Sequence, residues 1–149
     1  MHPFLFMALS AHAEPTETAA PPAGAAEMHR ALSARDGAPP CEDIEALSEA
    51  PVEALLYIVD NATQPPWAGV RAAECLTQRH AAEAQPHIER WVQGADTRGF
   101  ALVAFNNISA MPVEVALPIA RAAINGPLAA DARPRLEKVD NDEIQALLK

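Results

Sequence analysis

Three side chains in one predicted helix have the types and spacing of metal ligands. His80, Glu83 and His87 are separated by three and four residues, which on a straight helix places them on one face. Pro86 lies within this stretch and interrupts that geometry. Because the spacing also matches no established zinc motif, we expect ordinary polar residues on an exposed helix face. The sequence predicts neither a metal site nor a cofactor.

Motifs for other catalytic chemistry are missing from the sequence. None of its four serines lies in G-x-S-x-G, and there is neither a Walker sequence nor a G-x-G-x-x-G run. Acidic pairs such as Glu42-Asp43 and Asp140/Asp142 are typical of helix N-termini, where negative charge is favourable. These patterns favour a protein without a catalytic centre of its own.

The composition predicts an all-α protein. The 149 residues include 33 alanines, only six glycines and 5% aromatic residues. Alanine favours helices over strands, which argues against a β-sandwich or barrel. A net charge of −9 and the lack of a basic run argue against nucleic-acid and anionic-membrane partners. No apolar stretch approaches the roughly 20 residues that span a bilayer, so we expect no membrane insertion.

The first thirteen residues are typical of a secretory signal peptide. Residues 4–9 form an apolar run, and Ala11-His12-Ala13 matches the A-x-A pattern for cleavage after Ala13. The basic N-terminal region is missing and the segment is short, which a start codon placed too far downstream would explain. The alternative is an apolar N-terminus without a function. We expect export, to the periplasm or out of the cell.

A linker is predicted to follow. Residues 14–40 are rich in proline and small residues, so they offer too little apolar surface to offset the entropy of ordering. One or two helical turns at residues 25–32 would be an addition outside the core.

From residue 41 to residue 149 the chain repeats with a period of 32–33 residues. Similar residues recur 32 positions apart: Leu76 and Ile108, Pro86 and Pro118, Val92 and Ile124. Asn61, Gly94 and Gly126 follow apolar helical runs at near-equal intervals, and we expect each to take the left-handed conformation that ends a helix.

Each period divides into two helices. The predicted helices are 42–48, 52–60, 65–78, 80–93, 97–108, 112–125, 130–139 and 141–148. Pro86 and Pro118 should each kink their helix or mark its true start. Stacked helix pairs of this period are typical of an α-solenoid, and we predict a short right-handed one of about 3.5 repeats.

Residues 65–76, Pro-Pro-Trp-Ala-Gly-Val-Arg-Ala-Ala-Glu-Cys-Leu, resemble the first helix of a HEAT-like repeat. Val70-Arg71 matches the signature pair of that family, whereas the next repeat has Val103 in place of the arginine. The resemblance covers residues 41–149 and implies an exported bacterial α-solenoid of antiparallel helix pairs. HEAT-like proteins are mostly binding scaffolds, and a minority are lyases or hydroxylases. The His-Glu pairs of the hydroxylases have no counterpart in this sequence.

Cys41 and Cys75 are candidates for a disulfide. An even number of cysteines in an exported protein favours pairing, and their separation of 34 residues approximates one repeat. Near-equivalent positions on stacked helices face each other, so a bridge would join two repeats. The alternative is two unrelated buried thiols in a cytosolic protein.

We therefore expect a non-catalytic scaffold or adaptor for a protein or peptide partner in the cell envelope. The residues predicted to bind the partner are Trp67, Glu89, Arg90, Gln93, Arg121 and Asn125. Trp91 is a second aromatic candidate, for which packing between repeats is the better interpretation. The alternatives are an accessory or lyase-type enzyme that acts with a partner subunit, and a purely structural spacer.

Overall fold

The computed structural model describes residues 20–149, and every regular element in this range is a helix. The elements are α1 (Ala25–Leu32), α2 (Cys41–Glu45), α3 (Pro51–Asn61), α4 (Pro66–Arg79), α5 (Ala81–Gln93), α6 (Arg98–Asn107), the 3-10 turn η1 (Ile108–Ala110), α7 (Val113–Ile124), α8 (Ala129–Leu136) and α9 (Asp142–Leu147). The all-α prediction is confirmed for this range. The predicted signal peptide, with its cleavage point after Ala13, lies outside it.

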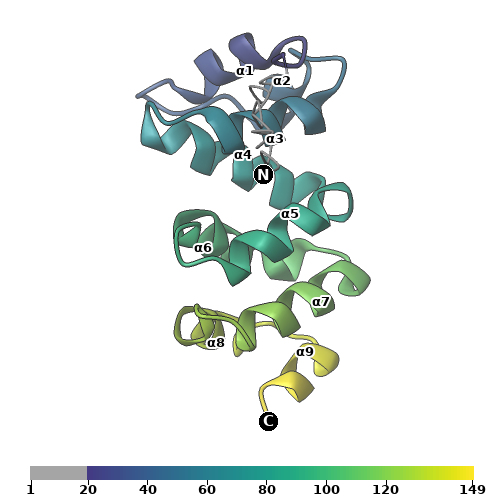
Figure 1. Cartoon of the computed structure of the whole chain (residues 1–149). Coiled ribbons are helices and arrows are strands. Elements are labelled where there is room, and N and C mark those ends of the chain that lie inside the picture. The colour runs from purple at the N-terminus through teal and green to yellow at the C-terminus, as the bar shows by residue number, and fades with distance from the viewer. Residues whose placement is uncertain (1–19) are drawn as a thin grey trace, which may run out of the picture.

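The helices lie in successive layers along the molecule, from α1 and α2 at one end to α9 at the other (Figure 1). Helix α4 packs against α6, and α6 against α8; we call these three helices the even row. Helix α5 packs against α7, and α7 against α9, which form the odd row. The two rows contact each other through α5 with α6 and α7 with α8. In residues 20–149, no helix has the length and apolar content needed to cross a bilayer.

Alanine is the most frequent residue in the buried core of residues 20–149. Ala72 and Ala73 of α4, Ala104 of α6 and Ala120 of α7 are completely buried. Because a methyl side chain is short, it allows neighbouring helices to approach closely. Larger side chains fill the remaining space, among them Trp91, which is 2% exposed and packs near Phe100. Packing is therefore the role of Trp91.

The helical turns that the sequence allowed at residues 25–32 are present as α1, but the expectation that they lie outside the core is wrong. Met28 and Leu32 are completely buried where α1 packs against α3 and α4. The Arg71 side chain of α4 also donates hydrogen bonds to the carbonyl oxygens of Leu32, at 2.7 Å, and Ala34, at 2.6 Å. These contacts offset an ordering entropy that the local composition could not offset alone.

Helices end at or within two residues of Asn61, Gly94 and Gly126 as predicted, but the left-handed conformation predicted for these three residues is wrong. Among residues 20–149, positive φ occurs only at Gly24 and Gly37. Close approach explains the glycine at position 94, because a Cβ there would lie 2.6 Å from Oγ1 of Thr97. That hydroxyl donates a hydrogen bond of 2.7 Å to the carbonyl oxygen of Trp91. Space, rather than backbone conformation, therefore requires Gly94.

Prolines lie inside three helices without marking where they begin. Pro86, Pro118 and Pro134 are each the sixth residue of their helix, in α5, α7 and α8. A proline cannot donate to the carbonyl four residues earlier. The residues that lose this bond are all exposed to solvent, which can hydrogen-bond their carbonyls instead: Ala82, Glu114 and Ala130. Of the two alternatives predicted for Pro86 and Pro118, the one in which each marks the start of its helix is therefore wrong.

Replacing Met28 with alanine tests whether α1 belongs to the core. Met28→Ala should lower the free energy of unfolding by about 2–5 kcal/mol, because it leaves a cavity between α1 and its neighbours. Urea unfolding followed by circular dichroism measures this change. The matched control is Glu27→Ala at the exposed neighbouring position, which should stay within about 0.5 kcal/mol of the parent. Equal stability of the two variants would contradict the packing of α1.

Candidate functional site

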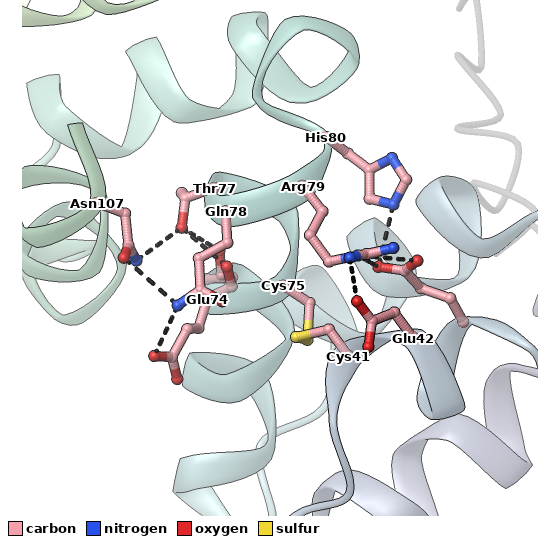
Figure 2. Close-up of a disulfide and its surroundings, with 11 residues drawn as sticks. Cys41, Glu42, Glu74, Cys75, Thr77, Gln78, Arg79, His80 and Asn107 are labelled. Atoms are coloured by element: carbon pink, nitrogen blue, oxygen red, sulfur yellow. Dashed lines mark hydrogen bonds and ion pairs between the residues drawn. A yellow bond between two sulfur atoms is a disulfide. The ribbon is translucent and has the colours of Figure 1, made fainter. Parts of the chain in front are cut away.

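A disulfide joins Cys41, the first residue of α2, to Cys75 in α4 (Figure 2). The two Cα atoms are 5.5 Å apart, and Cys75 is 2% exposed. The pairing predicted from the sequence is confirmed. The bond attaches the N-terminal part of the described chain to the even row.

Ion pairs hold α2 to the end of α4 beside the disulfide (Figure 2). The Arg79 guanidinium lies 2.8 Å from Oε1 of Glu42 and 2.9 Å from Oε1 of Glu45. The hydrogen bond that Arg79 donates to Glu45, together with the negative charge of Glu45, raises the pKa of Arg79 above its ordinary value. Nε2 of His80 lies 3.1 Å from the same Glu45 oxygen. Arg79 and the two glutamates are therefore engaged in attaching α2.

A second polar network joins α4 to α6 on the other side of the disulfide (Figure 2). The Asn107 side chain donates to Oγ1 of buried Thr77 at 3.1 Å, and the Gln78 amide donates to Oε1 of Glu74 at 3.2 Å. A pocket of about 630 Å³ lies next to the disulfide and is lined by Glu74, Gln78 and Arg79 among others. Because these side chains already bind neighbouring residues, the polar groups of this pocket serve packing between helices.

The three residues with metal-ligand spacing do not converge on one point. Nδ1 of His80 lies 3.4 Å from Oε1 of Glu83, whereas Nδ1 of His87 lies 2.7 Å from the Arg90 guanidinium. Within residues 20–149, no group of three or more His, Cys, Asp or Glu side chains is placed to hold a metal ion.

Four of the six residues predicted to bind a partner line one groove between α5 and α7. Glu89 and Gln93 come from α5, Arg121 comes from α7, and Asn125 follows it directly. The groove has a volume of about 360 Å³. Glu89 and Arg121 are 32 positions apart, as are Gln93 and Asn125, which is the period found in the sequence. We call this feature the odd-row groove.

The other two predicted residues lie outside this groove. Arg90 is exposed and contacts His87. Trp67 is 37% exposed at the start of α4, where its indole N–H donates to the carbonyl oxygen of Ser33 at 3.3 Å. The six residues therefore do not form one continuous site.

The odd-row groove presents a cation beside hydrogen-bonding side chains. Among residues 20–149, no side-chain hydrogen bond or ion pair occupies the Arg121 guanidinium. Asn125 donates one amide hydrogen bond to the Arg121 carbonyl oxygen at 3.0 Å, and Glu89 accepts one from Gln85 at 2.8 Å. Pro118 and Gly126 complete the lining with little side-chain bulk. This arrangement can receive the backbone of another chain.

The sequence analysis missed a pocket of about 440 Å³ between α6 and α8. Its polar lining consists of Asn106, Ser109, Arg135 and Lys138. The available signal was the group of basic residues at 133–138 in an otherwise acidic chain. We call this feature the even-row pocket.

An ion pair next to this pocket joins α6 to α8. The Arg98 guanidinium binds both carboxylate oxygens of Asp131, at 2.8 Å and 3.0 Å. This hydrogen bonding is the largest cause that lowers the pKa of Asp131 below its ordinary value, and the charges of Arg98 and Arg135 lower it further.

No protein-family model matches this chain, and neither a curated protein nor a solved structure matches it.

Reducing the disulfide should destabilise the fold. Cys41 and Cys75 are 34 positions apart. In the chain-entropy model, closing a loop of this length stabilises the folded state by roughly 3–4 kcal/mol. Urea unfolding with and without reductant measures the loss, and intact mass should rise by two hydrogen atoms on reduction. The control is a Cys41→Ala, Cys75→Ala double variant, whose stability should not respond to reductant. An unchanged mass would show that the bond is absent.

The ion pair of Asp131 should contribute to stability in a pH-dependent way. Because folding lowers the pKa of Asp131, the contribution is present above the pKa of the unfolded chain and is lost as pH falls through the lower folded value. When the pH is lowered from about 5 to about 2, the free energy of unfolding should therefore fall less in Asp131→Asn than in the parent, as measured by urea unfolding. Asp96→Asn, which changes an exposed carboxylate without an ion pair in the described range, is the control. Parallel pH profiles for Asp131→Asn and the parent would contradict this role.

Proposed function

We propose that the chain is a HEAT-like α-solenoid, right-handed and of about 3.5 helix-pair repeats, that acts as a non-catalytic scaffold for a protein or peptide partner. Two observations support the repeat architecture. Each row continues through helices two apart in the sequence. Side-chain hydrogen bonds along the even row also connect residues 29 to 33 positions apart, close to the sequence period.

The odd-row groove carries the proposal of partner binding. Its polar residues occupy equivalent positions of two successive repeats, so the same outward face of α5 and α7 supplies both walls. Stacked helix pairs offer extended surfaces of this kind to their ligands. Arg121, Gln93 and Asn125 are all exposed and can hydrogen-bond the carbonyl oxygens of a bound peptide. Trp67 would be a separate aromatic anchor at the end of the even row.

Export to the cell envelope is part of the same proposal. Disulfides persist in oxidising compartments and are rare in the reducing cytosol. The Cys41–Cys75 bond therefore supports the interpretation of residues 1–13 as a signal peptide, and with it a partner in the periplasm or outside the cell.

Loss of the groove side chains should weaken peptide binding. Peptides selected from a random displayed library on the parent protein should bind Arg121→Ala, Asn125→Ala at least about tenfold more weakly in fluorescence anisotropy, because two hydrogen-bonding groups are removed. Trp67→Ala, measured separately, tests whether this residue also contacts the peptide.

Arg30→Ala is the matched control, because it removes one exposed arginine on α1, away from the groove lining. It should bind the selected peptides as the parent does. Failure of the library to yield any binder, or unchanged affinity in the groove variant, would count against the scaffold at this site.

A further inference from the structure

The even-row pocket combines positive charge with an apolar floor. Arg135 and Lys138 line it together with the hydrogen-bonding side chains of Asn106 and Ser109, and no carboxylate is part of its lining. This is a local reversal in a chain of net charge −9. A pocket with this lining favours an anionic ligand.

Arg135 lacks an anionic partner because the carboxylate one turn earlier on α8 is already engaged. Both oxygens of Asp131 bind Arg98 on α6. Arg135 instead donates from Nε to Oδ1 of Asn106 at 2.9 Å and from Nη1 to the backbone oxygen of Asp131 at 2.8 Å. Within residues 20–149, neither Arg135 nor Lys138 forms an ion pair. In the part of the chain that the structure describes, the pocket therefore holds two positive charges that form no direct ion pair with a carboxylate.

The contacts of Arg135 also hold its guanidinium in place while leaving donors for a ligand. A guanidinium has five N–H groups, and the two bonds described above use two of them. The remaining donors, one on Nη1 and two on Nη2, can form charge-assisted hydrogen bonds to a carboxylate. Ser109 and Lys138, both exposed at the rim, can donate to the same anion.

The pocket is larger than a carboxylate group. Its volume is about 440 Å³. Its floor is formed by three apolar residues that are each at least nine-tenths buried: Phe105, Ile108 and Val139. This floor provides apolar contact for one side chain attached to the anion. The complementary ligand thus carries a carboxylate and an adjoining apolar group.

We infer that the even-row pocket binds the C-terminal carboxylate of a peptide whose last residue is apolar. This inference rests on the proposed function as a peptide-binding scaffold and adds a second, charge-selective site on the other row. Arg135 holds the carboxylate, Lys138 adds positive charge, and the floor takes the final side chain.

The test titrates N-acetyl-L-leucine, which carries both required groups, into the full chain. Its binding should shift the ¹⁵N NMR signals of the Ser109 and Lys138 amides and of Arg135 Nε–H, with a dissociation constant on the order of 2 mM for a ligand of this size. N-acetyl-L-leucinamide, which lacks the charge, and inorganic phosphate, which lacks the apolar group, should each bind at least about tenfold more weakly.

Two variants and one matched control locate the site. Arg135→Gln and Lys138→Gln should each weaken binding at least about fivefold. The Lys138 side chain is exposed and makes no hydrogen bond within the described range, so its variant tests the site even if Arg135→Gln disturbs packing. Arg133→Gln removes the same charge from the same helix, outside the pocket lining, and should bind as the parent does.

Each contrary result overturns the inference. Equal affinity for the amide would show that charge is not recognised, and equal or tighter binding of phosphate would indicate a general anion site. If Arg133→Gln and Arg135→Gln lost the same binding affinity, the ligand would be responding to the overall charge of the protein and not to this pocket. Absence of saturable shifts up to about 50 mM would show that the pocket does not bind this ligand at all. None of these three variants changes a residue of the odd-row groove. A failure of peptide binding at that groove would therefore contradict the proposed function and can be distinguished from a failure at the even-row pocket.

Discussion

Close contact between alanine-lined helix faces is the constraint on which the arrangement of this protein depends. A buried methyl group removes little apolar surface from water, so one contact stabilises an alanine-rich helix only slightly. Each central helix therefore buries several faces at once: α6 contacts α4, α5 and α8. This requirement explains why the helices form layered rows and why Trp91 and Phe105 are placed where methyl groups alone would leave space.

The N-terminal end of the layers is held by additional means. Helix α2 has only five residues and buries a single large side chain, Ile44. Such a short segment gains little from packing, and its position depends on the covalent bond from Cys41 and on the ion pairs of Arg79. The cysteine pair and Arg79 are thus engaged in holding α2 in place. The odd-row groove and the even-row pocket both lie between successive helices of a row.

The sequence predicted the helices well because alanine runs and prolines mark them clearly. It failed at α1, since the burial of Met28 depends on α3 and α4, which a local composition does not reveal. The odd-row groove was partly predictable, because Glu89 and Arg121 are outward residues one period apart. The even-row pocket was not, because its charge depends on the Asp131 carboxylate of α8 being engaged by Arg98 of α6 rather than by Arg135 of α8 itself, and a pairing between two helices is not visible in the local sequence.

The interior prolines have a consequence for how the molecule opens. In α5, α7 and α8 the first turn lacks one backbone hydrogen bond that later turns possess, and the carbonyls concerned belong to exposed residues. Local fluctuations should therefore begin at these turns, while the later part of each helix stays closed. The walls of the odd-row groove come from later turns. On α5 they follow Pro86 in the sequence, and on α7 they begin at Pro118. A ligand in this groove would therefore contact a surface that stays ordered while the first turns of α5 and α7 unwind and reform.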